Sequence, residues 1–331
     1  VELGITAVLP DCKVRKVSIA DCGEGTVEAM VENLSGEWVE VEVCDPLMRP
    51  IDIRYGVVDD GRTAVMEMSA ASGLPLLAVT ERNPLKTTTY GTGQMIVDAV
   101  KSGVRRLLIG IGGSATNDGG TGMLTALGFS FKDVNGAPIP QGAEGLGFLH
   151  SISAENVMPE LKYCSFSVAC DVTNPLCGEF GCSRVFAPQK GATPDDVTKM
   201  DLWLKNYADI TKSIFPEADD EYPGTGAAGG LGFAFLNYLK GELNSGVNII
   251  LKETGFEKYL EKLKVNDFKY EGTSYYSRDV KAIYINAFNE LTDPRGYANV
   301  FYHEYAHMIV TEAGFIDSSG NYSEGFQKFN D

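Results

Sequence analysis

The stretch that most constrains the fold of this chain is residues 107–123, where a short apolar run leads directly into a glycine-rich loop. Its sequence is LLIGIGGSATNDGGTGM, which contains six glycines together with Ser114, Thr116, Asn117 and Asp118. A buried strand that opens into glycine-rich backbone lets main-chain N–H groups come close to an anionic ligand. The sequence therefore predicts an α/β enzyme that binds a small molecule carrying phosphate.

The balance of charges excludes two classes of partner. The chain has a formal net charge of −17, whereas binding to nucleic acid or to an anionic membrane surface requires clustered Lys and Arg. No stretch approaches the roughly 18 apolar residues of a membrane span. The seven cysteines form no CxxC pair, which is typical of reduced thiols in the cytosol. We expect a cytoplasmic protein with small-molecule partners, without nucleic acid or membrane; its oligomeric state is left open.

Short apolar runs alternate with helical patterns up to about residue 263. Strands are predicted at 14–21, 38–45, 51–59, 64–68, 105–112 and 163–171, and helices at 27–34, 93–103 and 194–215. A glycine-rich turn that runs into an apolar helix is predicted at 224–239. Such alternation is typical of α/β proteins built on a parallel sheet. Polar residues follow several of these strands, at the edge where open α/β sheets bind their ligands.

The order of these loops resembles the glycerate kinases of the type that shares no motif with sugar or P-loop kinases. The matching stretches are DCGEGT (21–26), AVMEMSAASGL (64–74), NPLKTTTYGTGQMI (83–96), GIGGSATNDGGTGM (110–123), CDVTNPLCG (170–178), FAPQKGA (186–192) and GAAGGLG (226–232). The resemblance covers roughly residues 1–263. It implies ATP-dependent, Mg²⁺-assisted phosphorylation of D-glycerate, in a two-domain α/β fold whose active site lies between the domains.

Phosphoryl transfer needs positioning and neutralisation of charge, which backbone amides, a metal-holding carboxylate and a cation supply. Lys190 is the expected cation for a substrate carboxylate or for the transferring phosphoryl group. Asp118 or Asp171 is expected to hold Mg²⁺ through its oxygens, and which aspartate acts as the base stays open. The predicted nucleotide-binding residues are Gly112, Gly113, Ser114, Asn117, Gly119, Asn174 and Gly229.

Two motifs of the family are not found. An Asp-Ser-Phe-Lys motif is expected ahead of residues 1–9, so we expect further chain before Val1, and a Gly-Glu-Gly motif is expected after residue 263. The predicted domains are an incomplete Rossmann-like part at 1–45, a central and nearly whole α/β domain at 46–240, and the start of a return to the first domain at 241–263. Turnover is expected to suffer from the missing parts.

The last 65 or so residues, 264–331, differ in character and contain an HExxH motif. On a helix, His303 and His307 lie on one face and can bind one Zn²⁺, with Glu304 activating a bound water. The predicted third ligand is Glu324, with Glu312 and Asp317 as alternatives. We predict an α+β zincin-like segment in which 282–286 is an edge strand. The alternatives are a helix that packs two histidines against its core, and an inactive fusion of two fragments.

Overall fold

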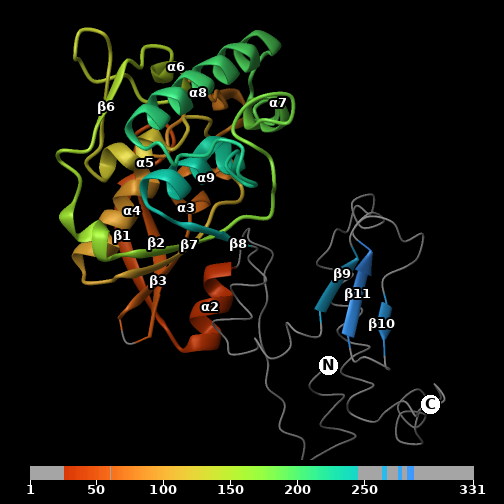
Figure 1. The fold of residues 1–331 in the computed structure, drawn as a ribbon. Coiled ribbons are helices and arrows are strands. Elements are labelled where there is room, and N and C mark those ends of the chain that lie inside the picture. Colours follow the sequence, from red (N-terminus) through yellow and green to blue (C-terminus); the bar gives the residue numbers. More distant parts are fainter. Residues whose placement is uncertain (1–25, 60, 245–262, 267–274, 278–281, 287–331) are drawn as a thin grey trace, which may run out of the picture. The chain divides into compact units, whose positions relative to one another are not determined.

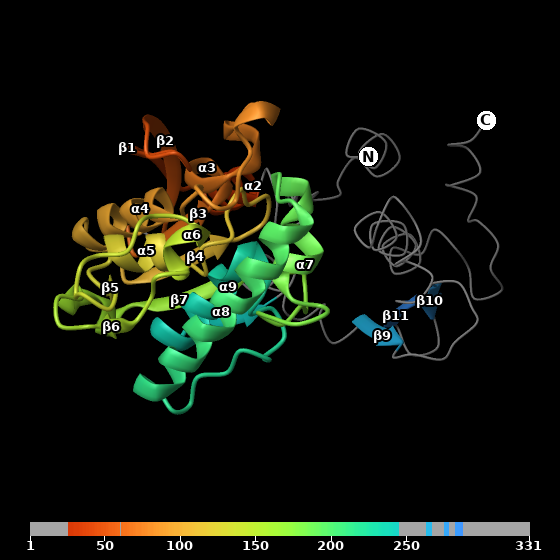
Figure 2. The same cartoon turned by 90° about the horizontal axis from the view of Figure 1, so that it is seen from above.

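The computed structural model describes residues 26–59, 61–244, 263–266, 275–277 and 282–286 (Figures 1 and 2). The chain divides into two compact units, one formed by Ser18–Ile250 and the other by Val1–Val17 together with Leu251–Asp331. A six-stranded sheet lies in the first unit and a three-stranded sheet in the second. The strand predicted at 14–21 lies outside the described residues.

The strands and helices of the first unit follow the predicted pattern closely. Its strands are β1 (Glu37–Cys44), β2 (Pro50–Val58), β3 (Thr63–Glu67), β4 (Arg106–Gly110), β5 (Ser130–Lys132), β6 (Ser151–Ser153), β7 (Ser165–Ala169) and β8 (Glu242–Asn244). Its helices are α2 (Thr26–Leu34), α3 (Ser69–Ser72), α4 (Tyr90–Lys101), α5 (Thr121–Ala126), α6 (Ala143–Leu146), α7 (Cys182–Phe186), α8 (Pro194–Ile214) and α9 (Ala227–Tyr238). An α/β architecture is thereby confirmed.

The main sheet is mixed, with the strand order β1-β2-β3-β4-β7-β8. Strand β2 pairs antiparallel with β1 and with β3, whereas β3, β4, β7 and β8 run parallel to one another. Glu67 pairs with Gly110, and Gly110 pairs with Ala169, so the carboxyl ends of β3, β4 and β7 lie level. The loops that follow these three strands therefore begin at the same edge of the sheet.

Alternation of apolar side chains along β4 explains how both faces of the sheet are covered. Leu108 belongs to a cluster with Val27, Met30 and Val65, through which α2 packs on one face. Leu107 and its alternate neighbours along the strand belong to the larger cluster, which includes residues of α4, α5 and α9. The period of two places successive residues on opposite faces, so each β4 residue contacts only one helical layer. Figures 1 and 2 show these layers.

Helix α8 begins where the sequence predicts it. The Thr193 side chain accepts a hydrogen bond from Asp196 N, and Asp196 Oδ2 accepts one from Thr193 N, while Pro194 occupies the first turn. This capping box satisfies two backbone donors that the first turn otherwise leaves without partners. The buried face of α8 then packs Met200, Leu204 and Tyr207 into the core.

Helix α9 contains the glycine-rich turn that the sequence predicts ahead of the apolar helix in 224–239. Ala228, Gly229 and Gly230 have φ values of 52°, 68° and 93°, which form a left-handed turn before the right-handed part of the helix. Gly229 shows why: a Cβ there would lie 2.1 Å from Thr116 O, so only glycine permits this close approach. The start of α9 thus packs directly against the loop that follows β4.

The second unit is described only by three strands. Its sheet has the order β10-β11-β9, with β9 (Leu263–Asn266), β10 (Tyr275–Ser277) and β11 (Ala282–Asn286). The predicted strand at 282–286 is present, but the expectation that it is an edge strand is wrong, because β11 pairs with a neighbour on each side. The predicted domain boundary between 45 and 46 falls between β1 and β2, which pair along their whole length.

Candidate active site

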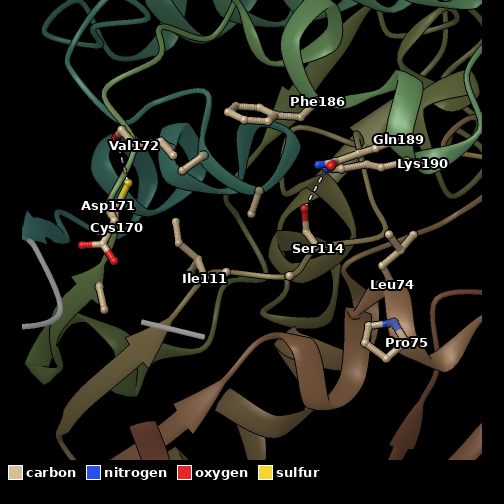
Figure 3. A pocket seen from close by; sticks show the side chains of 15 residues that line it. Leu74, Pro75, Ile111, Ser114, Cys170, Asp171, Val172, Phe186, Gln189 and Lys190 are labelled. Atoms are coloured by element: carbon tan, nitrogen blue, oxygen red, sulfur yellow. Dashed lines mark hydrogen bonds between the residues drawn. The ribbon is translucent and has the colours of Figure 1, made fainter. Parts of the chain in front are cut away.

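A cavity of about 480 Å³ lies at the carboxyl ends of β4 and β7 (Figure 3). The loop after β4 contributes residues 111–114, and the loop after β7 contributes residues 170–172. The remaining walls come from Leu74 and Pro75, from the end of α7 and the 3₁₀ turn after it, and from the start of α9. Its location matches the edge at which α/β sheets bind ligands, as the sequence predicts.

A buried lysine forms hydrogen bonds with the loop after β4 at one end of this cavity. Lys190 is 2% exposed, and its Nζ donates hydrogen bonds of 2.7 Å to Ser114 Oγ and 2.7 Å to Thr116 O. The 3₁₀ turn Pro188–Lys190 carries the side chain, and Gly191 follows at a φ of 98°. Burial lowers the pKa of Lys190 to about 8, while the charge of Asp118 opposes that shift. The ammonium therefore stays mostly protonated at pH 7.

The lysine also determines what Ser114 presents. Because Ser114 Oγ accepts from Lys190, its own hydroxyl proton points elsewhere. Within the described part of the chain, the backbone amides of Gly112, Gly113 and Ser114 have no hydrogen-bond acceptor, and Gly113 has a φ of 71°. The third N–H of the ammonium, the serine hydroxyl and these amides form a set of donors beside one cavity. We call this set, Gly112–Ser114 with Lys190, the anion cradle.

Asp118 lies inside the fold and not in the cavity wall. Its Oδ2 accepts from Thr89 N at 2.8 Å and from Thr89 Oγ1 at 2.9 Å, and its Oδ1 accepts from Gly120 N at 3.1 Å. Gly122 N donates to Oδ2 as well. Burial raises the pKa of Asp118, and these donors oppose that shift because they favour the charged form. The carboxylate ties the loop after β4 to the start of α4.

Three predicted nucleotide-binding residues make contacts within the fold. Asn117 is buried and its Nδ2 donates to Ser183 Oγ at 2.9 Å. Gly119 N donates to Gly229 O at 2.9 Å, so these two glycines join the loop to α9. A Cβ at Gly119 would lie 2.9 Å from the Tyr207 ring. All three shape the loop beneath the cavity, and none of them lines the cavity.

Among the described residues, Asp171 is the carboxylate residue that lines the cavity. It lies two residues after the end of β7 and is exposed, in contrast to Asp118. Asn174, three residues further on, donates from Nδ2 to Phe180 O at 2.8 Å and does not line the cavity. Gln189 lines it beside Lys190. Gly112, Gly113, Ser114, Asp171 and Lys190 all line this one cavity, with Asp171 toward the end away from Ser114 and Lys190 (Figure 3).

Several lining residues were not singled out from the sequence. Phe186 lies in the FAPQKGA stretch, Ala228 in GAAGGLG, and Leu74 at the end of AVMEMSAASGL. The signal that reveals them is their place within motifs that also carry polar site residues. Apolar side chains in such loops usually indicate core packing, so their exposure to a cavity requires the tertiary structure.

Neither the HExxH motif nor its third ligand can be placed. His303, Glu304, His307 and Glu324 lie outside the described residues. Among the residues that are described, no three His, Cys, Asp or Glu side chains come together as a metal site. In the same ranges, no helix is long and apolar enough to cross a membrane.

The glycerate kinase family model matches residues 1–266. The chain belongs to this family. Glycerate kinase from Bacillus subtilis is 44% identical over 261 residues, which are 79% of this chain and 68% of that protein. Glycerate 2-kinase from Escherichia coli is 44% identical over 260 residues, covering 78% of this chain and 68% of its relative.

A solved structure agrees with the fold of this family member. The crystal structure of a protein assigned as glycerate kinase 2 from Salmonella typhimurium has a TM-score of 0.76 and 44% identity, covering 80% of this chain and 71% of that one. The family match ends at residue 266, ahead of the HExxH motif, so the zincin-like prediction finds no support in it. The mixed α/β fold is that of a glycerate kinase.

Proposed function

We propose that this protein is a kinase that transfers the γ-phosphoryl group of ATP to D-glycerate. The relatives are named as glycerate kinases, and the family match supplies the reaction class. The observation that supports it best is the anion cradle, in which buried Lys190 contacts Ser114 beside amides without acceptors. Phosphoryl transfer depends on such positioning and charge neutralisation.

The proposed roles follow from what each group offers. The Gly112–Ser114 amides and the Ser114 hydroxyl donate hydrogen bonds to phosphate oxygens, and Lys190 supplies the positive charge. A lysine held by two fixed acceptors keeps its remaining N–H in place, so no reorganisation is needed when an anion binds. The cation therefore stabilises negative charge that develops during transfer.

Asp171 is the proposed magnesium ligand. Mg²⁺ in kinases is bound by one or two carboxylates together with substrate phosphates, so a single exposed carboxylate in the cavity fits this metal. Magnesium supplies neutralisation of the phosphate charge when it is bound. Asp118 has the wrong surroundings for this role, because protein donors already contact both of its oxygens.

The first experiment measures ADP release with Mg-ATP and D-glycerate. We expect turnover by the natural chain and a loss of at least about 100-fold in kcat for Lys190→Met, the scale reported for removal of one transition-state donor. Lys199→Met is the matched control, because Lys199 is an exposed lysine of α8 that pairs with Asp195 away from the cavity. Its kcat should stay within twofold of the natural value.

Two outcomes would contradict this proposal. A folded natural chain without ADP release would show that it is not a functional glycerate kinase. Equal turnover by Lys190→Met and the natural chain would show that Lys190 does not take part in the reaction. Thermal unfolding of both variants is measured alongside, because a variant that fails to fold says nothing of chemistry.

A further inference from the structure

The cavity has walls of two different kinds. One end carries the anion cradle, and the rest of the surface is mostly apolar, with Ile111, Val172, Phe186 and Ala228 among its side chains. In Figure 3 the Phe186 ring lies over Ile111, with Val172 toward one end and Lys190 toward the other. We call these four apolar residues the apolar wall. An aromatic ring that is half-buried and faces a cavity offers a flat surface to a ligand.

D-glycerate cannot use such a wall. Each of its three carbons carries oxygen, so every part of this substrate needs hydrogen-bond partners or water, and contact with apolar side chains costs free energy. The volume of about 480 Å³ also falls in the range of pockets that enclose larger ligands. Of the two substrates in the proposed reaction, only the nucleotide has an apolar face, which is that of its base.

We propose that the apolar wall binds the base of the nucleotide, with Phe186 stacking on it while the phosphates reach the anion cradle. This assignment rests on the proposed kinase function and adds the subsite of the donor. Phe186 is the last residue of α7 and Lys190 ends the 3₁₀ turn that follows it, so one short stretch of chain contacts both ends of the nucleotide. Stacking on an aromatic side chain contributes about 1–3 kcal/mol per base.

The test measures binding by calorimetry, independently of turnover. For Phe186→Ala we expect the affinity for a non-hydrolysable ATP analogue with Mg²⁺ to fall about 5- to 150-fold, which is the stacking contribution converted at tenfold per 1.4 kcal/mol. Affinity for inorganic tripolyphosphate, which has no base, should stay within twofold. Phe186→Tyr keeps the ring and should restore nucleotide affinity.

A matched control separates stacking from general effects. Phe180 is 67% exposed, precedes the same helix and does not line the cavity, so Phe180→Ala should leave both affinities unchanged. Unchanged nucleotide affinity in a folded Phe186→Ala variant would overturn the proposal. An equal loss of affinity for tripolyphosphate would also overturn the proposal, because it would show that the ring maintains the structure of the anion cradle and does not stack on the base.

Failure of this subsite is distinguishable from failure of the kinase function. If the natural chain releases ADP with D-glycerate but Phe186→Ala binds the nucleotide normally, only the subsite assignment is wrong. If the natural chain binds neither nucleotide nor tripolyphosphate, the cradle itself is misassigned and the proposed function falls with it.

Discussion

At the scale of single residues, burial separates side chains that look alike in the sequence. Asp118 and Asp171 both follow predicted strands in glycine-containing loops. Asp118 is fully buried with protein donors on both oxygens, whereas Asp171 is exposed in the cavity wall. A buried carboxylate that accepts several backbone N–H groups organises a loop, whereas Asp171 lies at the surface of the cavity.

Replacing each aspartate should therefore affect a different property. In Asp118→Ala, the amides of Thr89, Gly120 and Gly122 lose their acceptor inside the fold, so the free energy of unfolding should drop by more than about 3 kcal/mol. Asp171→Asn should change it by less than about 1 kcal/mol but lower kcat with Mg-ATP. Urea unfolding and ADP release measure the two effects; a stable Asp118→Ala variant would contradict this assignment.

Part of the candidate site is predictable from residue types alone. Gly112, Gly113, Ser114, Asp171 and Lys190 are polar or glycine residues in loops after strands, and the structure brings all of them to one cavity. The burial of Asp118 and Asn117 depends on partners far along the chain, such as Ser183 for Asn117, and Asn174 donates across a turn to Phe180 O. No local pattern encodes such a partner.

At the scale of elements, the junction between the loop after β4 and α9 shows how local geometry supports the cavity. Ala228 lines the cavity in a left-handed conformation with a φ of 52°, which an L-residue adopts at a cost of about 1–2 kcal/mol. Gly229 follows at a φ of 68° and accepts from Gly119 N. The glycines of this segment predict a turn ahead of the helix, but hydrophobic periodicity carries no information about the sign of φ at Ala228.

Two neighbouring substitutions in this turn should have opposite effects. Ala228→Gly relieves the strain of the left-handed conformation, but glycine loses more backbone entropy on folding. Because these two effects oppose each other, the free energy of unfolding should stay unchanged or rise by up to about 1 kcal/mol. Gly229→Ala places a methyl group 2.1 Å from Thr116 O and should lower it by more than about 2 kcal/mol. The midpoints of urea unfolding test this pair. A more stable Gly229→Ala variant would refute the geometry of the turn.

At the scale of the whole molecule, the order of strands and helices in the first unit was largely predictable. Strong alternation along β1 and β2 and the capping residues of α8 are local signals, and each predicted element of that unit within the described residues is present. The pairing order was not predictable, since the register of β4 with β7 is determined by side chains from both. The domain division stays a prediction, as does everything that concerns the HExxH motif.

Stability of the molecule should fall in alkaline solution. Burial raises the pKa of Cys182 to about 12 and also raises the pKa of Cys170 and Cys177. In the unfolded chain these thiols lose their protons near pH 8.5, so the unfolded state binds fewer protons and the stability they contribute is lost above that pH. Lys190 has the opposite effect on stability, because its pKa of about 8 in the folded chain lies below its pKa in the unfolded chain. Its contribution to the free energy of unfolding therefore increases as the pH rises.

The three thiols outnumber the one lysine, so the free energy of unfolding should be lower at pH 10 than at pH 7.5. Lys190→Met removes the opposing group and should make the decrease steeper. Urea unfolding at several pH values between 7.5 and 10.5 measures both slopes. A free energy that rises over this range would show that the thiols are less buried than the structure indicates.

Parallel pairing joins strands that are distant in the chain, since Leu107 pairs with Phe166 and Ser167 pairs with Glu242. During synthesis the glycine-rich loop leaves the ribosome long before Lys190, and Ala228 follows later still. The cavity walls come from residues between 74 and 228. A nascent chain halted before α9 therefore carries the GGSATNDGG loop without the cavity, and ligand binding begins only when the first unit is almost completely synthesised.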